Sequence, residues 1–432
     1  MFSSRDPVPA SLENTLLRRA IFLDAPIFAK ETIMSETKPK KKLVIFCDGT
    51  WNEPTKRGTN VVRMLQGTDF ADADGNPQLT HYIAGVGTRK DEKVVGGAFG
   101  FGISDNIKDA YAFIVSNYEP GDDIYLFGFS RGAYTARSIA GLIHNLGVLQ
   151  RWNLPLVSIA YDHYKDRAEE WRPGGASAQT FRDENCHPYP AKVKFLGVWD
   201  TVGALGAPYG EILGRLIDKF FHTSFHDVTL STSVDSAYHA LAADERRWPF
   251  RPTPIALTDY HRERNARNIA ERGFPFYTER WFPGVHSNVG GGYEEHGLSD
   301  YALVWMAERA ADNGLKLLNF ANVKLSFTRP FGPDPAEKIQ NSQTFLYRLA
   351  TVLLVKLPAT LGLPSVYPLD DQRLAKYVTW SGDYIRPIDS GEDFGPVREK
   401  AEIDPAYRPK QLPARAGATE TAPQKEKVRE PA

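Results

Sequence analysis

The feature that most constrains the fold is an apolar run leading into a serine flanked by glycines. Residues 124–127 are Ile-Tyr-Leu-Phe, and Gly128-Phe129-Ser130-Arg131-Gly132 follows directly. In a nucleophile elbow of this GxSxG form, the serine occupies a strained turn between a strand and a helix, and small neighbours avoid collisions with both. Apolar residues at helical spacing come next: Ala133, Ala136, Ala140, Ile143 and Leu146. This order predicts that Ser130 is a nucleophile, although an ordinary tight turn of an α/β sheet would share it.

Apolar runs alternate with helical patterns along the chain. Five runs predict strands, at residues 43–47, 81–84, 124–127, 193–199 and within 276–285. A helical face at residues 107–118 separates the second run from the third. Alternation of this kind predicts an α/β fold, with a mostly parallel sheet and helices on both faces. Ligands of such sheets bind at the carboxyl ends of the strands.

Composition divides the chain into four parts. We expect a weakly structured tail at 1–41, a catalytic domain at 42–330, an extension packed on it at 331–400, and a disordered tail at 401–432. Lid-like insertions are expected within the catalytic domain. Residues 205–225 carry an amphipathic pattern that fits core packing or a membrane-docking lid. Met34, which starts a polar run ahead of the first predicted strand, is a candidate initiator.

Charge and cysteine content exclude several classes of protein. The net charge is -1 without a basic stripe, which argues against nucleic-acid binding. Cys47 and Cys186 have neither metal-ligand nor disulfide-framework spacing, and no metal or cofactor is expected. The apolar stretch at 351–363 is interrupted by Lys356 and Pro358, and no signal peptide is evident. We therefore expect a cytoplasmic protein, or one exported without a signal peptide, and no transmembrane segment.

The first predicted strand ends in Asp48-Gly49-Thr50-Trp51-Asn52. Oxyanion donors in elbow hydrolases come from the N–H after the nucleophile and from a loop after an earlier strand. Arg131, Gly49 and Thr50 are therefore the candidate oxyanion hole, with Asp48 beside it or capping its own loop. Phosphatases with a DxDGT motif share the Asp-Gly-Thr. Phe46 stands where their nucleophilic aspartate would be, which disfavours that class.

Two aspartates are candidates for the acid of a catalytic triad. Asp200 ends the fourth predicted strand, and a strand tip is rigid enough to orient a histidine and stabilise its imidazolium form. An aspartate in this position also caps turns. Asp244, within Ala-Ala-Asp-Glu-Arg-Arg at 242–247, is the alternative acid. Its cluster equally fits a structural ion-pair network with the two arginines.

The candidate base is His286, in the glycine-rich stretch at 282–293. A loop histidine can take a proton from a serine hydroxyl and pass it to a leaving group. A hydrogen-bonded histidine without a catalytic role would look the same in the sequence. Ser130, Asp200 and His286 follow one another in the chain order of α/β-hydrolase triads.

Five motifs carry a family resemblance: CDGTWN at 47–52, YIAGVGT at 82–88, GFSRGAYTAR at 128–137, GVWDTVGALG at 197–206 and FPGVHSNVGGGY at 282–293. Together they resemble the catalytic domain of type VI secretion phospholipase effectors, over about residues 42–310. The resemblance implies an α/β-hydrolase fold, a Ser-Asp-His triad and ester hydrolysis of phospholipase A type. The family often has aspartate where this chain has Asn288, which keeps an acceptor but loses the charge.

These features predict a serine esterase that works through an acyl-enzyme, with phospholipid as the substrate implied by the resemblance. An esterase for small soluble esters and a non-catalytic interaction module with the same fold are the alternatives. The expected partners are the ester substrate and a membrane surface in peripheral contact, but no nucleic acid. A secretion-apparatus or immunity protein as partner, and export by a type VI system, are implied by the resemblance.

Overall fold

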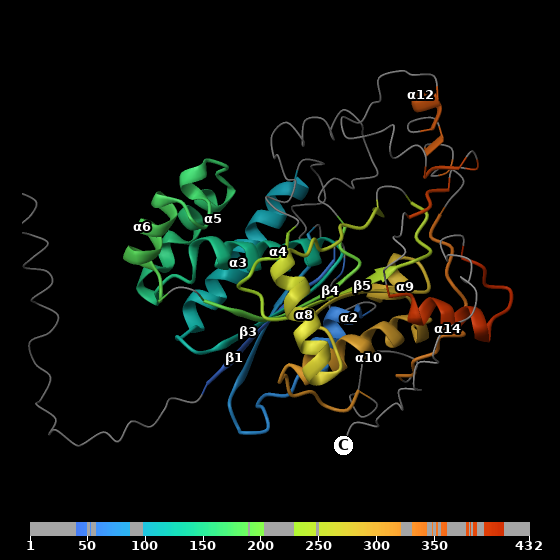
Figure 1. Cartoon of the computed structure of the whole chain (residues 1–432), viewed down its shortest axis with the longest axis horizontal. Helices are drawn as coiled ribbons and strands as arrows, with labels where there is room; N and C mark the ends of the chain where they lie inside the picture. The colour runs from blue at the N-terminus through green and yellow to red at the C-terminus, as the bar shows by residue number, and fades with distance from the viewer. Residues whose placement is uncertain are drawn as a thin grey trace, which may run out of the picture. The chain divides into compact units, whose positions relative to one another are not determined.

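A six-stranded parallel sheet forms the centre of the described structure (Figure 1). The computed structural model describes residues 40–49, 52, 58–86, 98–188, 191–202, 229–247, 250–320, 331–343 and parts of 348–409. All of them belong to one compact unit, Lys40–Ala432, and the other unit, Met1–Pro39, lies outside the described residues. The predicted lid segment at 205–225, the predicted tail up to residue 39 and the chain from 410 onward are also outside them. Residues 401–409, predicted as part of a disordered tail, are ordered: a helix runs from Gly395 to Ile403, and Tyr407 is buried.

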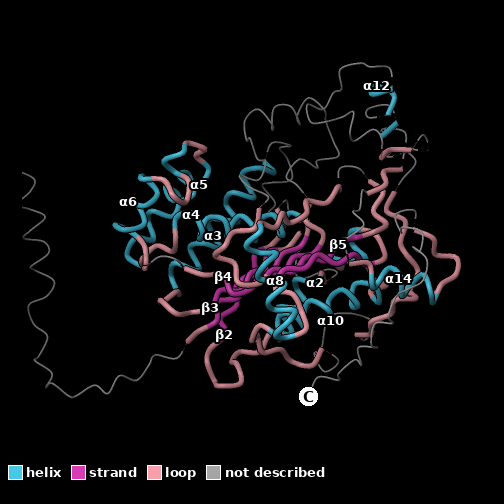
Figure 2. The backbone as a smooth tube through the Cα atoms, in the orientation of Figure 1, coloured by secondary structure: helices cyan, strands magenta, loops and turns pink. Residues whose placement is uncertain are grey.

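The strand order in the sheet is β2-β1-β3-β4-β5-β6, and every neighbouring pair is parallel. Figure 2 shows the strands in magenta, gathered between helices. The strands are β1 Lys42–Cys47, β2 Gln78–Ile83, β3 Asp123–Phe129, β4 Val193–Trp199, β5 Ala237–Ala242 and β6 Tyr277–Phe282. The predicted fold class, an α/β-hydrolase-like parallel sheet, is confirmed.

Helices cover both faces of the sheet because side chains alternate along each strand. In β1, Leu43 and Ile45 join one core, whereas Val44 and Phe46 join the other. The first core is covered by α3 Ala98–Asn117, α4 Arg131–Leu146, α5 Val157–Lys165 and α6 Ala176–Asn185. The second is covered by α2 Asn60–Gly67, α9 His286–Gly290 and α10 Gly297–Asp312. The helix α8 Asp259–Arg272 precedes β6, and the 3-10 turns η2 Arg151–Leu156 and η3 Glu169–Trp171 flank α5.

One strand, β5, was not predicted from the sequence. β5 has the sequence Ala-Tyr-His-Ala-Leu-Ala, which contains no β-branched residue and lacks the composition typical of a strand. It is extended because it pairs on both sides, with β4 and with β6, and every one of its residues is buried. The second strand was predicted a few residues late, since β2 spans Gln78–Ile83 rather than 81–84.

The strand order places the predicted site residues at one edge of the sheet. Because β1 lies between β2 and β3, the order reverses there, and ligands of α/β sheets bind outside the strand ends at such a switch point. Asp48 follows β1, Ser130 follows β3 and Asp200 follows β4. His286 comes four residues after the end of β6. All four residues therefore start from the carboxyl edge of the sheet.

The C-terminal segment packs against the β6 edge. Asp393 lies beside Arg280 in a parallel bridge, accepts the Trp281 N–H at 2.9 Å through its backbone oxygen, and pairs with the Arg280 guanidinium at 2.6 Å. Phe394 stacks on Trp281, with ring centroids 6.2 Å apart. Of the two described helices in this segment, α12 Leu357–Thr360 and α14 Gly395–Ile403, α14 contacts β6. These contacts cover what would be an open strand edge, while the division at residue 330 stays a prediction.

None of the helices among the described residues is both long enough and apolar enough to cross a membrane.

Candidate active site

Ser130 lies in the turn between β3 and α4, with backbone angles φ 57° and ψ −121°. Within the described part of the chain, Ser130 and Asp200, at φ 37°, are the two residues other than glycine with positive φ. Such a backbone costs about 1–3 kcal/mol and persists only where the surroundings impose it. Backbone strain therefore coincides with the predicted nucleophile and the predicted acid.

The glycines on either side of Ser130 are required by close backbone packing. A Cβ on Gly132 would lie 2.1 Å from the carbonyl oxygen of Cys47, and a Cβ on Gly128 would lie 2.4 Å from that of Gly132. Any side chain at either position would push α4 away from β1 and β3. The GxSxG pattern thus lets the first turn of α4 lie directly against the end of β1.

Asp200 and His286 are joined by a hydrogen bond. Nδ1 of His286 lies 2.6 Å from Oδ2 of Asp200. Asp200 is fully buried, and His286 is 5% exposed. The Asp200 N–H donates to the oxygen of Ala240 at 2.7 Å, and its Oδ1 accepts the Ala242 N–H at 3.0 Å, so β5 fixes the carboxylate from one side.

Ser130 and His286 are brought together through Phe129. The imidazole of His286 lies 4.6 Å from the Phe129 ring, measured between centroids. At the other end of α9, a Cβ on Gly290 would lie only 1.9 Å from Cε2 of Phe129, so this helix rests directly on the residue before Ser130. The Ser130 N–H donates to the oxygen of Trp199, the residue before Asp200, at 3.0 Å. The turn that carries Ser130, the helix that carries His286 and the strand end before Asp200 therefore lie against one another.

The electrostatics keep the histidine neutral and the aspartate ionised. Burial would raise the pKa of Asp200, but the charge of Arg386 and hydrogen bonds from His286 and Arg386 outweigh it and hold this pKa well below its usual range. Burial lowers the pKa of His286, against the opposing hydrogen bond and charge of Asp200. Because an ionised carboxylate only accepts, Nδ1 carries the imidazole proton and Nε2 is left as the basic nitrogen.

The loop after β1 lies against Ser130, and one of its candidate oxyanion donors is bonded within the loop. A Cβ on Gly49 would lie 3.2 Å from the Cβ of Ser130. The Gly49 N–H, predicted to face an oxyanion, donates at 2.7 Å to Oδ1 of Asp48 in this structure. Thr50 lies outside the described residues, and Arg131 begins α4 immediately after Ser130.

Asp48 ties this loop to its neighbours. Its Oδ2 accepts the hydroxyls of Thr59 and Tyr82, both at 2.8 Å. Burial raises the pKa of Asp48 to about 6, against these hydrogen bonds and those from Gly49 and Asn52. Thr59 is the N-cap of α2 and forms an isolated bridge with Gly291, which follows α9. Asp48 thus links the β1 loop to the histidine segment.

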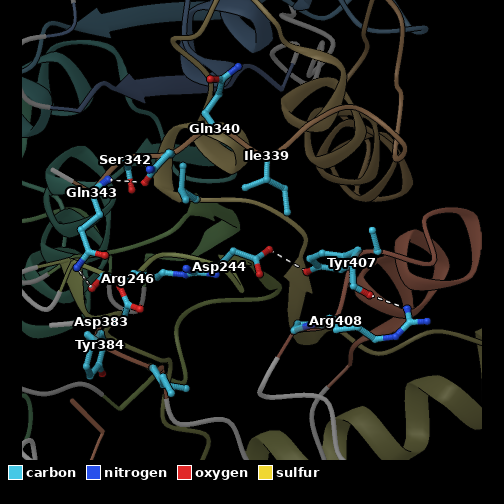
Figure 3. Close-up of a pocket in the computed structure, with 15 residues that line it drawn as sticks. Asp244, Arg246, Ile339, Gln340, Ser342, Gln343, Asp383, Tyr384, Tyr407 and Arg408 are labelled. Carbon is cyan, nitrogen blue, oxygen red and sulfur yellow. Dashed lines mark hydrogen bonds between the residues drawn. The ribbon is translucent and has the colours of Figure 1, made fainter. Parts of the chain in front are cut away.

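Asp244, the alternative acid, is held away from His286. Its Oδ2 accepts the Gly284 N–H at 2.7 Å and the Tyr407 hydroxyl at 2.8 Å, and its own N–H donates to the oxygen of Gly284 at 3.0 Å. Figure 3 shows the Asp244 carboxylate directed at Tyr407 beside a cavity of about 370 Å³. Burial is the main cause that raises the pKa of Asp244. Asp244 therefore shapes the turn leading into His286, and the carboxylate on the imidazole is that of Asp200.

Asn288 lies on α9 and is 1% exposed. Its Oδ1 accepts the N–H groups of Val285 at 3.2 Å and Gln340 at 3.3 Å, capping the start of α9. Its Nδ2 has no hydrogen-bond partner in the described part of the chain. The acceptor role expected of Asn288 is present, and it serves the backbone ahead of His286.

Three residues at the site were missed from the sequence. Arg386 binds Asp200 with Nη1 at 2.6 Å and Nη2 at 3.0 Å. Oε2 of Glu245 accepts the backbone N–H of His286 at 3.2 Å. His239, on β5, accepts the Thr201 N–H through Nε2 at 3.0 Å while its Nδ1 lies 2.7 Å from Oε1 of Glu279.

The sequence held different amounts of signal for these three residues. Glu245 adjoins Asp244 in the charged stretch at 242–247, whose composition fits an ion-pair network. His239 stands in the strand that was not predicted. Arg386 lies 186 positions from Asp200, outside all five motifs, and nothing in the sequence connects the two.

A parallel sheet with a strained serine turn and a histidine–aspartate pair at its carboxyl edge defines the α/β-hydrolase class of fold. A family model described as "T6SS, Phospholipase effector Tle1-like, catalytic domain" matches residues 41–309. The chain belongs to this family.

Individual relatives share less than a third of their aligned residues with this chain. An uncharacterized protein of Saccharomyces cerevisiae, YEL023C, is 27% identical over 238 residues, covering 50% of this chain and 33% of that protein. The Tle1 effector bound to the VgrG spike of a type VI secretion system has 19% identity and a TM-score of 0.36, with 62% of this chain and 56% of that chain covered. An uncharacterized protein from Pseudomonas aeruginosa has 18% identity and a TM-score of 0.39, with 74% and 54% covered. The chain thus spans a third of the yeast protein and just over half of each solved structure.

Proposed function

We propose that this chain is a serine hydrolase of carboxylic esters, with phospholipid as its substrate and phospholipase A type cleavage as its reaction. The observation that carries the proposal is the 2.6 Å hydrogen bond between His286 and Asp200, at the sheet edge where Ser130 occupies a strained elbow. Membership in a family of phospholipase effector domains supports the substrate class.

In the proposed reaction, Ser130 Oγ attacks the ester carbonyl and His286 Nε2 takes the hydroxyl proton. Asp200 stabilises the imidazolium that forms. The carbon–oxygen bond to the leaving alcohol then breaks, and His286 returns the proton to that alcohol. Water repeats the sequence on the acyl-enzyme, releasing the fatty acid and free Ser130.

The oxyanion that forms in each step needs N–H donors. The Arg131 amide, at the N-terminus of α4, is the first proposed donor, because it follows the nucleophile and benefits from the positive end of the helix dipole. The loop after β1 supplies the second, from Gly49 or Thr50. Since the Gly49 N–H donates to Asp48 in this structure, its use requires that bond to be exchanged for one to the oxyanion.

Labelling and product analysis test the proposal. A fluorophosphonate probe should label the wild-type protein and leave Ser130→Ala unlabelled, while Ser138→Ala, a buried serine two turns further along α4, should remain labelled. Incubation with defined phospholipids should release fatty acid and lysophospholipid, identified by mass spectrometry. Release from short-chain model esters alone would favour the small-ester alternative. A folded wild-type protein without labelling would favour the interaction module.

We further propose that the chain is exported by a type VI secretion system, with a secretion-apparatus protein as carrier and an immunity protein as inhibitor. The family description supports export of this kind. Because a yeast protein is among the relatives, the domain alone does not establish secretion. Detection of the protein outside cells that have an intact secretion system, and its loss when the system is inactivated, tests export separately from catalysis.

A further inference from the structure

Arg386 holds the carboxylate of Asp200 with a two-pronged contact. Nη1 donates to Oδ1 at 2.6 Å, and Nη2 donates to Oδ2 at 3.0 Å. Both side chains are completely buried. We propose that Arg386 is a positioning residue of the active site, which fixes the Asp200 carboxylate toward His286 and offsets its charge. The inference rests on the proposed triad of Ser130, Asp200 and His286.

The guanidinium fits this role because its terminal N–H groups are all used. Nη1 also donates to the oxygen of Ala242 at 2.6 Å, and Nη2 also donates to that of Phe250. Ala242 in turn donates its N–H to Oδ1 of Asp200. The planar guanidinium therefore connects Asp200 to the end of β5 and to Phe250. The Phe250 ring lies 5.0 Å from the imidazole of His286, measured between centroids. A lysine has a single ammonium and would not reproduce this geometry.

The backbone leading to Arg386 is itself fixed. The Tyr384 N–H donates to the oxygen of Arg246 at 3.0 Å, and the Ile385 N–H donates to that of Tyr377 at 2.8 Å. Tyr384 is 2% exposed and forms a bridge with Val378. A side chain anchored in this way can impose an orientation on its partner rather than follow it.

Three charged groups, Asp200, Glu245 and Arg247, act on His286 directly, and Arg386 acts on it through Asp200. Asp200 and Glu245 are acidic, whereas Arg386 and Arg247 are basic. Glu245 accepts the backbone N–H of His286 and pairs with Arg247 at 2.8 Å. The Arg247 guanidinium lies 3.7 Å from the centre of the Phe250 ring. These charges cancel while the imidazole is neutral. Removing Arg386 would leave an excess of negative charge beside the imidazole and favour its protonated form.

The position of Arg386 in the chain gives the inference a wider consequence. The family match ends at residue 309, and Arg386 lies 77 positions beyond it. The C-terminal extension would then be part of the catalytic apparatus rather than an accessory to it. A search restricted to the matched region would find the serine, the aspartate and the histidine but not the group that orients them.

The test compares Arg386→Met and Arg386→Lys with the same changes at Arg63, a buried arginine that pairs with Asp300. In Arg386→Met, kcat should fall about 10- to 100-fold with little change in KM, and the acid limb of kcat/KM should move up by about one pH unit, the effect of one nearby charge. Arg386→Lys should lie between it and wild type. The Arg63 variants should lower thermal stability without moving the pH profile.

An NMR titration separates this inference from the proposed function. The imidazole of His286 can be followed in full-length Ser130→Ala protein with and without Arg386→Met, which requires no activity. A higher His286 pKa in the double variant supports the positioning role even if no ester is cleaved. An unchanged His286 pKa, with unchanged kcat in the active protein, overturns it, as does an equal shift in Arg63→Met. If Arg386→Met does not fold, Arg386→Lys carries the test, and wild-type kcat in that variant overturns the inference.

Discussion

Among the described residues, two buried chains of bonded side chains each link an arginine, an aspartate and a histidine, and they differ in what surrounds them. Arg386–Asp200–His286 joins the C-terminal extension to the carboxyl edge of the sheet. The second chain, Arg63–Asp300–His296, joins α2 to the start of α10, and its histidine nitrogen lies 2.9 Å from the carboxylate. Both aspartates are fully buried, and both histidines are 5% exposed. The side-chain chemistry of the two chains is the same.

The difference lies in backbone placement. His286 rests on Phe129, next to the strained turn at Ser130. His296 and Asp300 lie one turn apart at the start of α10, where Oδ2 of Asp300 also accepts the Gly332 N–H at 2.9 Å. The second chain therefore acts as a tie between helices and a loop. A histidine–aspartate pair becomes a candidate site only where a nucleophile is presented to it.

The largest expected effect separates the two chains directly. Asp200→Asn should lower kcat by roughly 10⁴-fold, because the amide favours the wrong tautomer of His286. Asp300→Asn should leave kcat near the wild-type value and lower the free energy of unfolding by about 3–5 kcal/mol, as expected when a buried ion pair loses one partner. Steady-state kinetics and denaturant unfolding measure the two effects. Equal losses of kcat in both variants would contradict the division.

The next prediction concerns the loop against Ser130. Gly49→Ala should lower kcat/KM by about 10- to 100-fold, because the new methyl would lie 3.2 Å from the Cβ of Ser130 and 2.9 Å from Nδ2 of Asn52. Gly174→Ala is the control, since a Cβ there meets nothing within 4 Å. Probe labelling rates report the change at the nucleophile. Wild-type labelling of Gly49→Ala would remove the β1 loop from the proposed site.

The pH dependence of catalysis follows from the lowered pKa of His286. The folded protein keeps the imidazole neutral below the ordinary value of 6.5, so the acid limb of kcat/KM should have its midpoint below pH 6.5. Activity should fall tenfold for each further pH unit. Stability should also fall as the pH drops below 6.5, because the unfolded chain binds the proton first.

Asp48 is the control for that acid limb, because its pKa of about 6 lies in the same range. The limb should persist in Asp48→Asn if His286 is the group that titrates. Its disappearance in this variant would assign the limb to Asp48 instead.

The smallest expected effect concerns Asn288. Asn288→Asp would replace the buried Nδ2, which has no partner in the described residues, with an oxygen that also lacks a donor. Wild type already leaves this atom unpaired, so the added cost comes from burying a carboxylate in place of a neutral amide. We expect a loss of at least about 1–3 kcal/mol in the free energy of unfolding, because the penalty for an unsatisfied buried group is larger when that group is charged, with less than a tenfold change in kcat. A rise in kcat would indicate that the aspartate common in the family improves the site.

Several elements were predictable because their causes are local. β4 follows from the apolar run at 193–199, and α4 from its helical spacing and the glycine at its end, Gly147, with φ 75°. β5 was not predictable, since a run with three alanines and no β-branched residue becomes extended only between two existing strands. The bond from the Gly49 N–H to Asp48 is local instead, and it matches the alternative in which Asp48 caps its own loop.

The sequence by itself determined the elbow, the glycines that permit it, and the order of serine, aspartate and histidine along parallel strands. These features depend on backbone sterics and short-range periodicity, which a few consecutive residues are enough to reveal. Tertiary structure alone decided that Asp200, not Asp244, receives His286, and that Arg386 binds that carboxylate from 186 positions away. A buried charge requires a partner of opposite charge, and Arg386 can pair with Asp200 only once the C-terminal extension has packed on the sheet.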